Sequence, residues 1–161
     1  MMKYYLQRDT SDVSARYLAY DEKGSPIYTV TGKRNPSGES IRIVDAGGET
    51  VCKIRGLGFS VLSVYSISAG GESMRLNIAL GTGRASVRFR GISFIVRGDV
   101  LMGSYSILDA DTAEVCTVGK DFAKGCTQLL IHQEDREIFC IASAICIDSL
   151  NVGQIPALQM S

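Results

Sequence analysis

Ten consecutive residues near the C-terminus, 138–147, carry no charged side chain. A helix over this run is apolar on every side, so it has to be buried all round, in a large core or in a membrane. A membrane span needs roughly 17 to 25 apolar residues, so the run is too short to cross one. Ala142, Ser143 and Ala144 make its centre thin. The run predicts a slender helix enclosed by the rest of the protein.

Both ends of this helix are marked in the sequence. Three acidic residues between positions 134 and 137 precede it, where the helix dipole favours negative charge. Gly153 and Pro156 follow it, as helix stops often do. We expect a helix over about residues 135–151. A buried strand is the alternative, because Ile and Phe suit strands, but the length of the run and its alanines favour a helix.

The chain before this helix consists of short strand-like runs separated by turns. It is rich in Gly, with 17 in the sequence against 3 Pro, which suits many tight turns. Residues 84–90 alternate strictly, with arginines and a serine on one face and Ala85, Val87 and Phe89 on the other. This is the period of a half-buried strand. About a dozen such strands fit, and Asp21, Asp45 and Asp109 lie in the turns between them as ordinary turn formers.

Two halves of the chain resemble each other at a nearly constant offset of 63 to 66 residues. Residues 41–45 are echoed by 105–109, and Val51-Cys52 is echoed by Val115-Cys116. We infer two similar half-units of about 64 residues, each mostly strand. Residues 28–67 should therefore have the same strand order as residues 94–131.

Two similar sheets and one all-apolar helix have to share a core. The length favours a single domain over residues 1–161. A barrel removes sheet edges, and a barrel wider than eight strands can enclose a helix. The expected fold is mainly β with one helix: a closed antiparallel barrel of about twelve strands around the buried C-terminal hydrophobic helix.

Composition narrows the partners and the compartment. Formal net charge is zero, so no global electrostatic attraction draws the chain to nucleic acid or to anionic membrane, and any basic patch must be local. The five Cys are an odd number with no CxxC spacing, which indicates a reduced intracellular protein. The N-terminus turns polar too soon for a signal peptide. We expect a cytoplasmic protein with no transmembrane segment and no nucleic-acid partner.

A series of residues along the whole chain matches a known family: Met2, Lys3, Tyr4, Tyr5, Asp21, Gly24, Tyr28, Val30, Gly32, Lys33, Ile43, Val44, Asp45, Phe94, Val96, Gly98, Asp99, Tyr105, Ile107, Ile147 and Asp148. On these residues the sequence resembles the LURP-one-related family, which belongs with the Tubby C-terminal-like proteins. The resemblance implies a twelve-stranded barrel around a central helix, in agreement with the barrel reasoned above. Related proteins include Tubby, which binds phosphoinositides, and the phospholipid scramblases, but no Tubby lipid-binding motif is matched, so no lipid-site residues carry over.

No catalytic, metal or cofactor site is expected. His132 is the single histidine and has no evident nucleophile, so it is expected to be an exposed or capping residue. Cys52, Cys116, Cys140 and Cys146 lack zinc-ligand spacing and are expected to pack in the core. Cys126 is expected to be the most exposed cysteine. The glycines near 56–58 and 81–83 lack the context of a phosphate-binding loop.

The basic residues are the most suggestive set. Arg84, Arg88 and Arg90 share the polar face of one strand, and Arg97 follows shortly. Lys33, Arg34 and Arg42 form a second group. Arginine clusters bind phosphate well, but the same face could equally be a solvated one paired with acidic neighbours.

Three functional hypotheses follow. The first is a non-enzymatic binding or scaffold module with an unknown partner, such as another protein. The second is binding of an anionic phospholipid headgroup or phosphate ligand through the arginine face. The third is a hydrolase or transferase with carboxylates at the barrel mouth, for which a nucleophile–base pair is missing.

Overall fold

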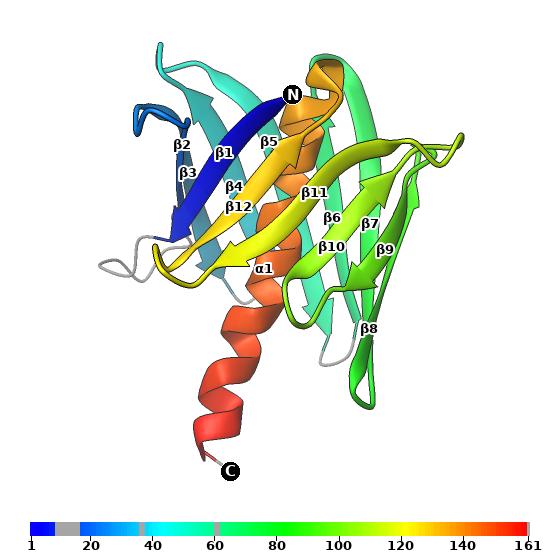
Figure 1. The fold of residues 1–161 in the computed structure, drawn as a ribbon. Coiled ribbons are helices and arrows are strands. Elements are labelled where there is room, and N and C mark those ends of the chain that lie inside the picture. The colour runs from blue at the N-terminus through cyan, green and yellow to red at the C-terminus, as the bar shows by residue number, and fades with distance from the viewer. Residues whose placement is uncertain (9–16, 36–37, 60–61, 161) are drawn as a thin grey trace.

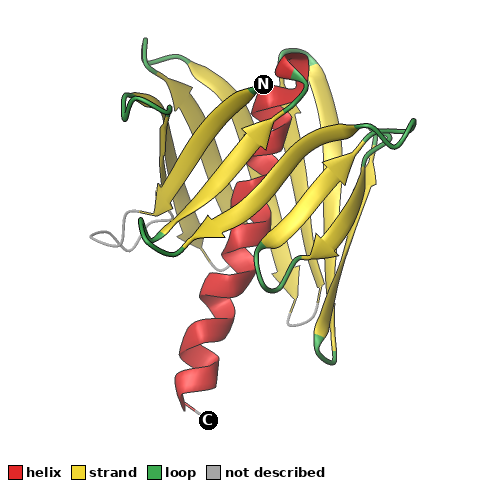
Figure 2. Cartoon of the chain, viewed as in Figure 1, coloured by secondary structure: helices red, strands yellow, loops and turns green. Residues whose placement is uncertain are grey.

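The computed structural model describes residues 1–8, 17–35, 38–59 and 62–160, apart from the side chains at 33–35, 39, 58–59 and 150–160. Within these residues, twelve antiparallel strands surround one long helix (Figures 1 and 2). The elements are β1 (Met2–Arg8), β2 (Tyr17–Tyr20), β3 (Pro26–Asn35), β4 (Gly38–Asp45), β5 (Thr50–Phe59), β6 (Leu62–Ala69), β7 (Glu72–Gly81), β8 (Arg84–Arg90), β9 (Ile95–Asp99), β10 (Ser104–Leu108), β11 (Glu114–Asp121), β12 (Cys126–Ile131), the 3-10 turn η1 (Glu134–Arg136) and α1 (Glu137–Met160).

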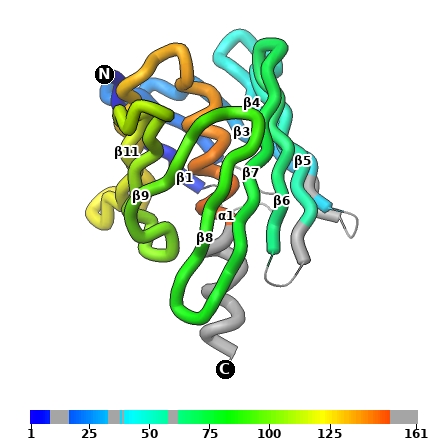
Figure 3. The backbone as a smooth tube through the Cα atoms, turned by 90° about the vertical axis from the view of Figure 1, so that its right-hand side faces the viewer, coloured from blue at the N-terminus to red at the C-terminus, as the bar shows by residue number. Residues whose placement is uncertain are grey.

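The strands form one sheet that curls into a nearly closed barrel. Its order is β8-β7-β6-β5-β4-β3-β2-β1-β12-β11-β10-β9, so β8 and β9 are its two ends. They lie on either side of a seam that no hydrogen-bonded ladder bridges (Figure 3). The rings of Phe89 and Phe94 pack edge to face at 5.5 Å where the two strands meet. This aromatic pair occupies the place where a closing ladder would begin. The mainly β barrel around a helix is confirmed, with closure complete except at this seam.

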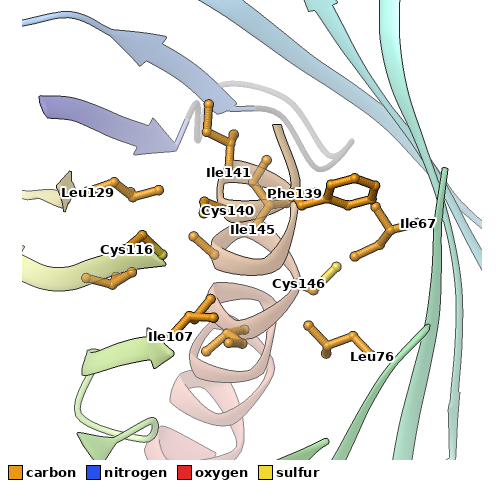
Figure 4. Close-up of a cluster of buried hydrophobic side chains, with 14 of the residues drawn as sticks. Ile67, Leu76, Ile107, Cys116, Leu129, Phe139, Cys140, Ile141, Ile145 and Cys146 are labelled. Atoms are coloured by element: carbon orange, nitrogen blue, oxygen red, sulfur yellow. The ribbon is translucent and has the colours of Figure 1, made fainter. Parts of the chain in front are cut away.

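The charge-free run fills the barrel. Residues 139–147 are all buried, and they pack against inward side chains of the surrounding strands, including Ile67, Leu76, Ile107 and Leu129 (Figure 4). The buried hydroxyl of Ser143 donates to the carbonyl of Phe139 at 2.7 Å, so the one polar side chain in this stretch is satisfied within the helix. The small residues at the centre of the helix let the strands approach it.

The helix does not end where the sequence predicts. It runs to Met160 and passes through Gly153 and Pro156, so the prediction of a stop near residue 151 is wrong. Glycine and proline raise the cost of a helix by about 1 and 3 kcal/mol respectively, but they do not forbid one. In Figure 1 the last turns of α1 extend beyond the strands at one end of the barrel.

The predicted repeat of strand order is confirmed. Strands β3 to β6 and strands β9 to β12 are each an antiparallel meander. The turns repeat in atomic detail. In one, the Asp45 carboxylate accepts backbone hydrogen bonds from residues 47 and 49, and in the other the Asp109 carboxylate accepts them from residues 111 and 113. Register shifts after Ile43 and Ile107 also lie 64 residues apart.

The left-handed position of this repeated turn tests the equivalence. Gly48 has φ 86° and Thr112, 64 residues later, has φ 62°. A left-handed conformation costs an L-residue about 1 to 2 kcal/mol, so Gly48→Thr should lower the free energy of unfolding by about that amount. Thr112→Gly should raise it by less than about 1 kcal/mol, because glycine also adds freedom to the unfolded chain. Urea unfolding of both variants checks this, and two shifts of the same sign would contradict the equivalence.

Candidate functional site

Strand β8 presents its arginines to solvent. Its side chains alternate as the sequence predicts: Arg84, Arg88 and Arg90 are exposed, while Ala85, Val87 and Phe89 between them are half-buried. Arg97 is also exposed, but it lies on β9 across the seam, opposite Ser106 of β10. The structure therefore places three of the four candidate arginines on one strand and the fourth on the other side of the seam.

The sheet register adds four more cations to the same outer surface. Arg75 of β7 stands opposite Arg90, and Arg42 of β4 stands opposite Lys53 of β5. Arg55 follows two residues after Lys53, so it points to the same side. All of these side chains are exposed. We call this set the basic face: Arg42, Lys53, Arg55, Arg75, Arg84, Arg88 and Arg90. Figure 3 looks toward the strands that carry most of it.

Carboxylates are scarce on this surface. Among the described side chains of β4 to β8, only Asp45 and Glu72 are acidic, and both lie at strand ends. Asp45 holds its turn, and Glu72 pairs with Arg136 at 2.7 Å. No hydrogen bond or ion pair joins a side chain of the basic face to another side chain that the structure describes. Its positive charge is therefore not neutralised by the described part of the chain.

One carboxylate stands at each end of the buried part of α1, Glu137 at its start and Asp148 where it leaves the barrel. Glu137 accepts hydrogen bonds from the phenols of Tyr4 and Tyr28. Eleven residues later, Asp148 accepts one from the Tyr17 phenol at 2.9 Å and pairs with the Lys120 ammonium at 2.9 Å. At 1.5 Å per residue the two carboxylates lie about 16 Å apart along the helix axis. They mark where the helix leaves the apolar core at each end.

These contacts also shift the titration of the phenols. Burial raises the pKa of Tyr4 and Tyr28 above the ordinary value, and their hydrogen bonds to the Glu137 carboxylate raise it further. Burial likewise raises the pKa of Tyr17, with the charge of Asp148 as the second cause. The phenols therefore remain protonated donors, which suits an anchoring role for the helix ends.

Comparison with known proteins gives the family. The LURP-one-related family model matches residues 2–148, nearly the whole chain. The chain belongs to the LURP-one-related family. It is 21% identical over 150 residues to the uncharacterized protein YxjI of Bacillus subtilis (strain 168), covering 92% of this chain and 93% of that protein. An X-ray structure of an Arabidopsis thaliana protein matches with a TM-score of 0.64 and 15% identity, covering 93% of this chain and 91% of that one. That structural likeness shows the fold alone.

Part of the basic face on this LURP-one-related barrel is not predicted from the sequence. Arg42 is recognisable as basic but is grouped in sequence with Lys33 and Arg34, whose side chains lie outside those described. Lys53, Arg55 and Arg75 are missed altogether. Within each strand, the alternation of side chains between the two faces indicates which residues point to the same side. Only the register between strands shows that these separate alternations line up on one surface.

The cysteine predictions are confirmed, but the prediction that His132 is an exposed or capping residue is wrong, because its side chain is half-buried against β11 and the cap of η1 is Gln133. Cys52, Cys116, Cys140 and Cys146 are buried, Cys126 is the most exposed of the five thiols, and none forms a disulfide. Burial raises the pKa of Cys126, which leaves it a poor nucleophile. The His132 ring contacts the Thr117 hydroxyl at 3.1 Å and the Glu114 carboxylate at 3.5 Å. Among the described residues no group of His, Cys, Asp and Glu could hold a metal ion.

Two surface hollows flank β1 and β12 of the LURP-one-related barrel. One, of about 290 Å³, is lined by Tyr5 and Tyr20, with the Lys124 ammonium 4.1 Å from the centre of the Tyr5 ring. The other, of about 220 Å³, lies at the barrel end where Asp148 and Lys120 pair. Over the described residues, no helix is both long enough and apolar enough to span a lipid bilayer.

Proposed function

We propose that this chain is a non-enzymatic binding module that docks on anionic phospholipid surfaces through the basic face. The supporting observation is that like charges stand directly opposite each other on neighbouring strands. Arg75 faces Arg90, and Arg42 faces Lys53. Strands lie about 4.8 Å apart, and like charges directly opposite destabilise a sheet. An anionic surface that binds the basic face would relieve this repulsion. A face that only contacts water gains nothing from like charges placed opposite each other.

The shape and the border of the face favour a membrane over a soluble phosphate. Its cations spread over four strands, β4, β5, β7 and β8, so they suit an extended array of headgroups. Leu57 and Leu62 are 44% and 42% exposed at the β5–β6 end of the face. Leu57 lies two residues after Arg55, so an apolar contact adjoins the cations. Polybasic surfaces bind anionic leaflets with about 1 kcal/mol for each Lys or Arg near the surface.

Vesicle co-sedimentation tests the proposal. Wild-type protein should pellet with vesicles that contain phosphatidylserine or a phosphoinositide but not with neutral phosphatidylcholine vesicles, and binding should fall as salt rises. Arg42→Glu/Arg55→Glu and Arg88→Glu/Arg90→Glu should each reduce the vesicle affinity about tenfold or more, because two attractions become repulsions. Circular dichroism should show both variants folded.

A charge-matched control separates the face from net charge. Lys23→Glu/Lys124→Glu makes the same change in total charge at exposed positions outside the basic face, and it should leave vesicle binding nearly unchanged. A soluble inositol polyphosphate provides the second arm. If it binds as tightly as vesicles do, the ligand is a free phosphate compound. A wild-type protein that ignores anionic vesicles at low salt would refute the lipid proposal.

Catalysis receives less support than binding. Asp148 is one carboxylate at a barrel end that a hydrolase could use, and its two oxygens already accept from Tyr17 and Lys120. Asp121 lines the same hollow, but no nucleophile and base are paired there among the described side chains. Five reduced thiols fit a reducing compartment, so the cytoplasm is the location we propose.

A further inference from the structure

Strand β8 is one of the two edges of the sheet. It pairs with β7 on one side, and on the other side only the seam separates it from β9. Every second backbone N–H and C=O group of an edge strand points away from its single partner. Such a row is a template for another strand unless the protein covers it. Within the described residues no ladder covers this row.

The inner side of β8 is apolar and incompletely buried. Ala85, Val87 and Phe89 are half-buried, whereas the inward residues of the neighbouring β7, Met74, Leu76 and Ile78, are fully buried. The difference arises because β7 has a strand on both sides and β8 has one on only one side. Across the seam, Ile95 of β9 is 53% exposed. An added strand would cover apolar surface as well as backbone groups.

Charge disfavours a second copy of the chain as the natural occupant of this edge. Antiparallel pairing of two β8 strands centred on Val87 would set Arg84 of one copy opposite Arg90 of the other. Like charges directly opposite destabilise a sheet, so the arginines protect the edge against self-association. The same arginines favour a strand that carries carboxylates on its outer side.

We propose that the β8 edge accepts an extended segment of a partner protein in which acidic and apolar side chains alternate. Backbone hydrogen bonds to β8 would provide affinity, and the alternate side chains would provide specificity. The acidic side chains would face Arg84, Arg88 and Arg90 on the outside. The apolar ones would cover Val87 and Phe89 on the inside. This inference uses the backbone edge and the inner row, which vesicle binding does not need.

A synthetic peptide tests the edge. The probe is an acetylated, fluorescently labelled peptide of alternating Glu and Val, measured by anisotropy with the full chain. Two further peptides carry N-methyl groups on all Glu or on all Val residues, so each lacks the donors along one of its edges. The parent should bind, one methylated peptide should bind nearly as well, and the other should lose binding. If the parent does not bind, or both methylated peptides bind as tightly as it does, the proposal is wrong.

Matched variants separate this site from the lipid proposal. Arg88→Glu should weaken parent-peptide binding about tenfold, because cross-strand attraction becomes repulsion. Arg55→Glu, the same change on β5, should alter peptide binding by less than about twofold while weakening vesicle binding. A peptide of alternating Lys and Val should prefer Arg88→Glu/Arg90→Glu over wild type. Equal effects of Arg55→Glu and Arg88→Glu on the peptide would overturn the assignment to the edge, as would sedimentation showing a dimer that the peptide cannot compete away.

Discussion

Replacing Ala144 by arginine is expected to leave no soluble, folded protein. Ala144 is 1% exposed and lies on the part of α1 that the barrel encloses. An unpaired charge in a dry core costs several kcal/mol, and the added volume costs about 1 to 3 kcal/mol more. The total stability of a single domain is only about 5 to 15 kcal/mol, so this one substitution removes most or all of it. Expression trials and circular dichroism give the result.

The control for this substitution is Ala110→Arg. Ala110 is exposed in the turn that follows β10, so the same added charge meets water there. We expect a shift in the unfolding free energy within about 0.5 kcal/mol, as for an ordinary surface change. Ala144→Ser provides a milder version at the buried site. An Ala144→Arg protein as stable as wild type would mean that the helix is not enclosed.

The central helix is predictable because its signal is local. The charge-free run needs complete burial, and Glu137 and Asp148 at its ends correspond to the points where it leaves the core. The end of the helix is not predictable from Gly153 and Pro156, because these residues change the local cost of a helix without fixing its length. The phenols that hold Glu137 and Asp148 come from β1, β2 and β3, more than 100 residues away in sequence.

The basic face is predictable from the sequence only within single strands. Alternation within residues 84–90 predicts that Arg84, Arg88 and Arg90 share a surface, and the structure agrees. That Arg75 stands opposite Arg90 depends on the hairpin register of β7 and β8, and that Arg42 stands opposite Lys53 depends on the register of β4 and β5. A one-residue change of register would put every side chain on the other side of the sheet. The pairing of the strands is therefore needed to show that these cations lie on one surface.

The seam between β8 and β9 is also not predicted by the sequence. A closed barrel is the simplest way to remove edges, and the duplication favours symmetric closure. The equivalence between the halves does not extend to the seam, where Phe89 and Phe94 pack between strands that carry no ladder. Strand β8 carries three exposed arginines and lies at an edge of the sheet, so neither its charge nor its outer row of backbone groups is paired within the described residues. Both binding proposals follow from these unpaired groups.

Stability is expected to fall in two steps as pH rises into the alkaline range. Burial raises the pKa of Cys52 to about 12. A hydrogen bond with Cys116 and burial raise the pKa of Cys140. Burial also raises the pKa of the phenols Tyr4, Tyr17, Tyr28 and Tyr105. The folded-state pKa of each group lies above its unfolded value, so its contribution is complete below the unfolded pKa and is lost as pH rises above it.

The window follows from the unfolded values. Thiols in an unfolded chain titrate near pH 8.5 and phenols near pH 10, so the first decline begins above about pH 8.5 and a steeper one above about pH 10. Each group that has lost its proton only in the unfolded chain removes about 1.4 kcal/mol per pH unit. Urea unfolding followed by circular dichroism from pH 7 to 11, with a reducing agent present, measures both steps.

Cys52→Ala should reduce the first slope. Tyr17→Phe should reduce the second, although it also removes the hydrogen bond to Asp148 and lowers stability at pH 7. An unfolding free energy that stays constant across this range would contradict the buried, hydrogen-bonded state of these thiols and phenols, and with it the anchoring of the helix at both ends.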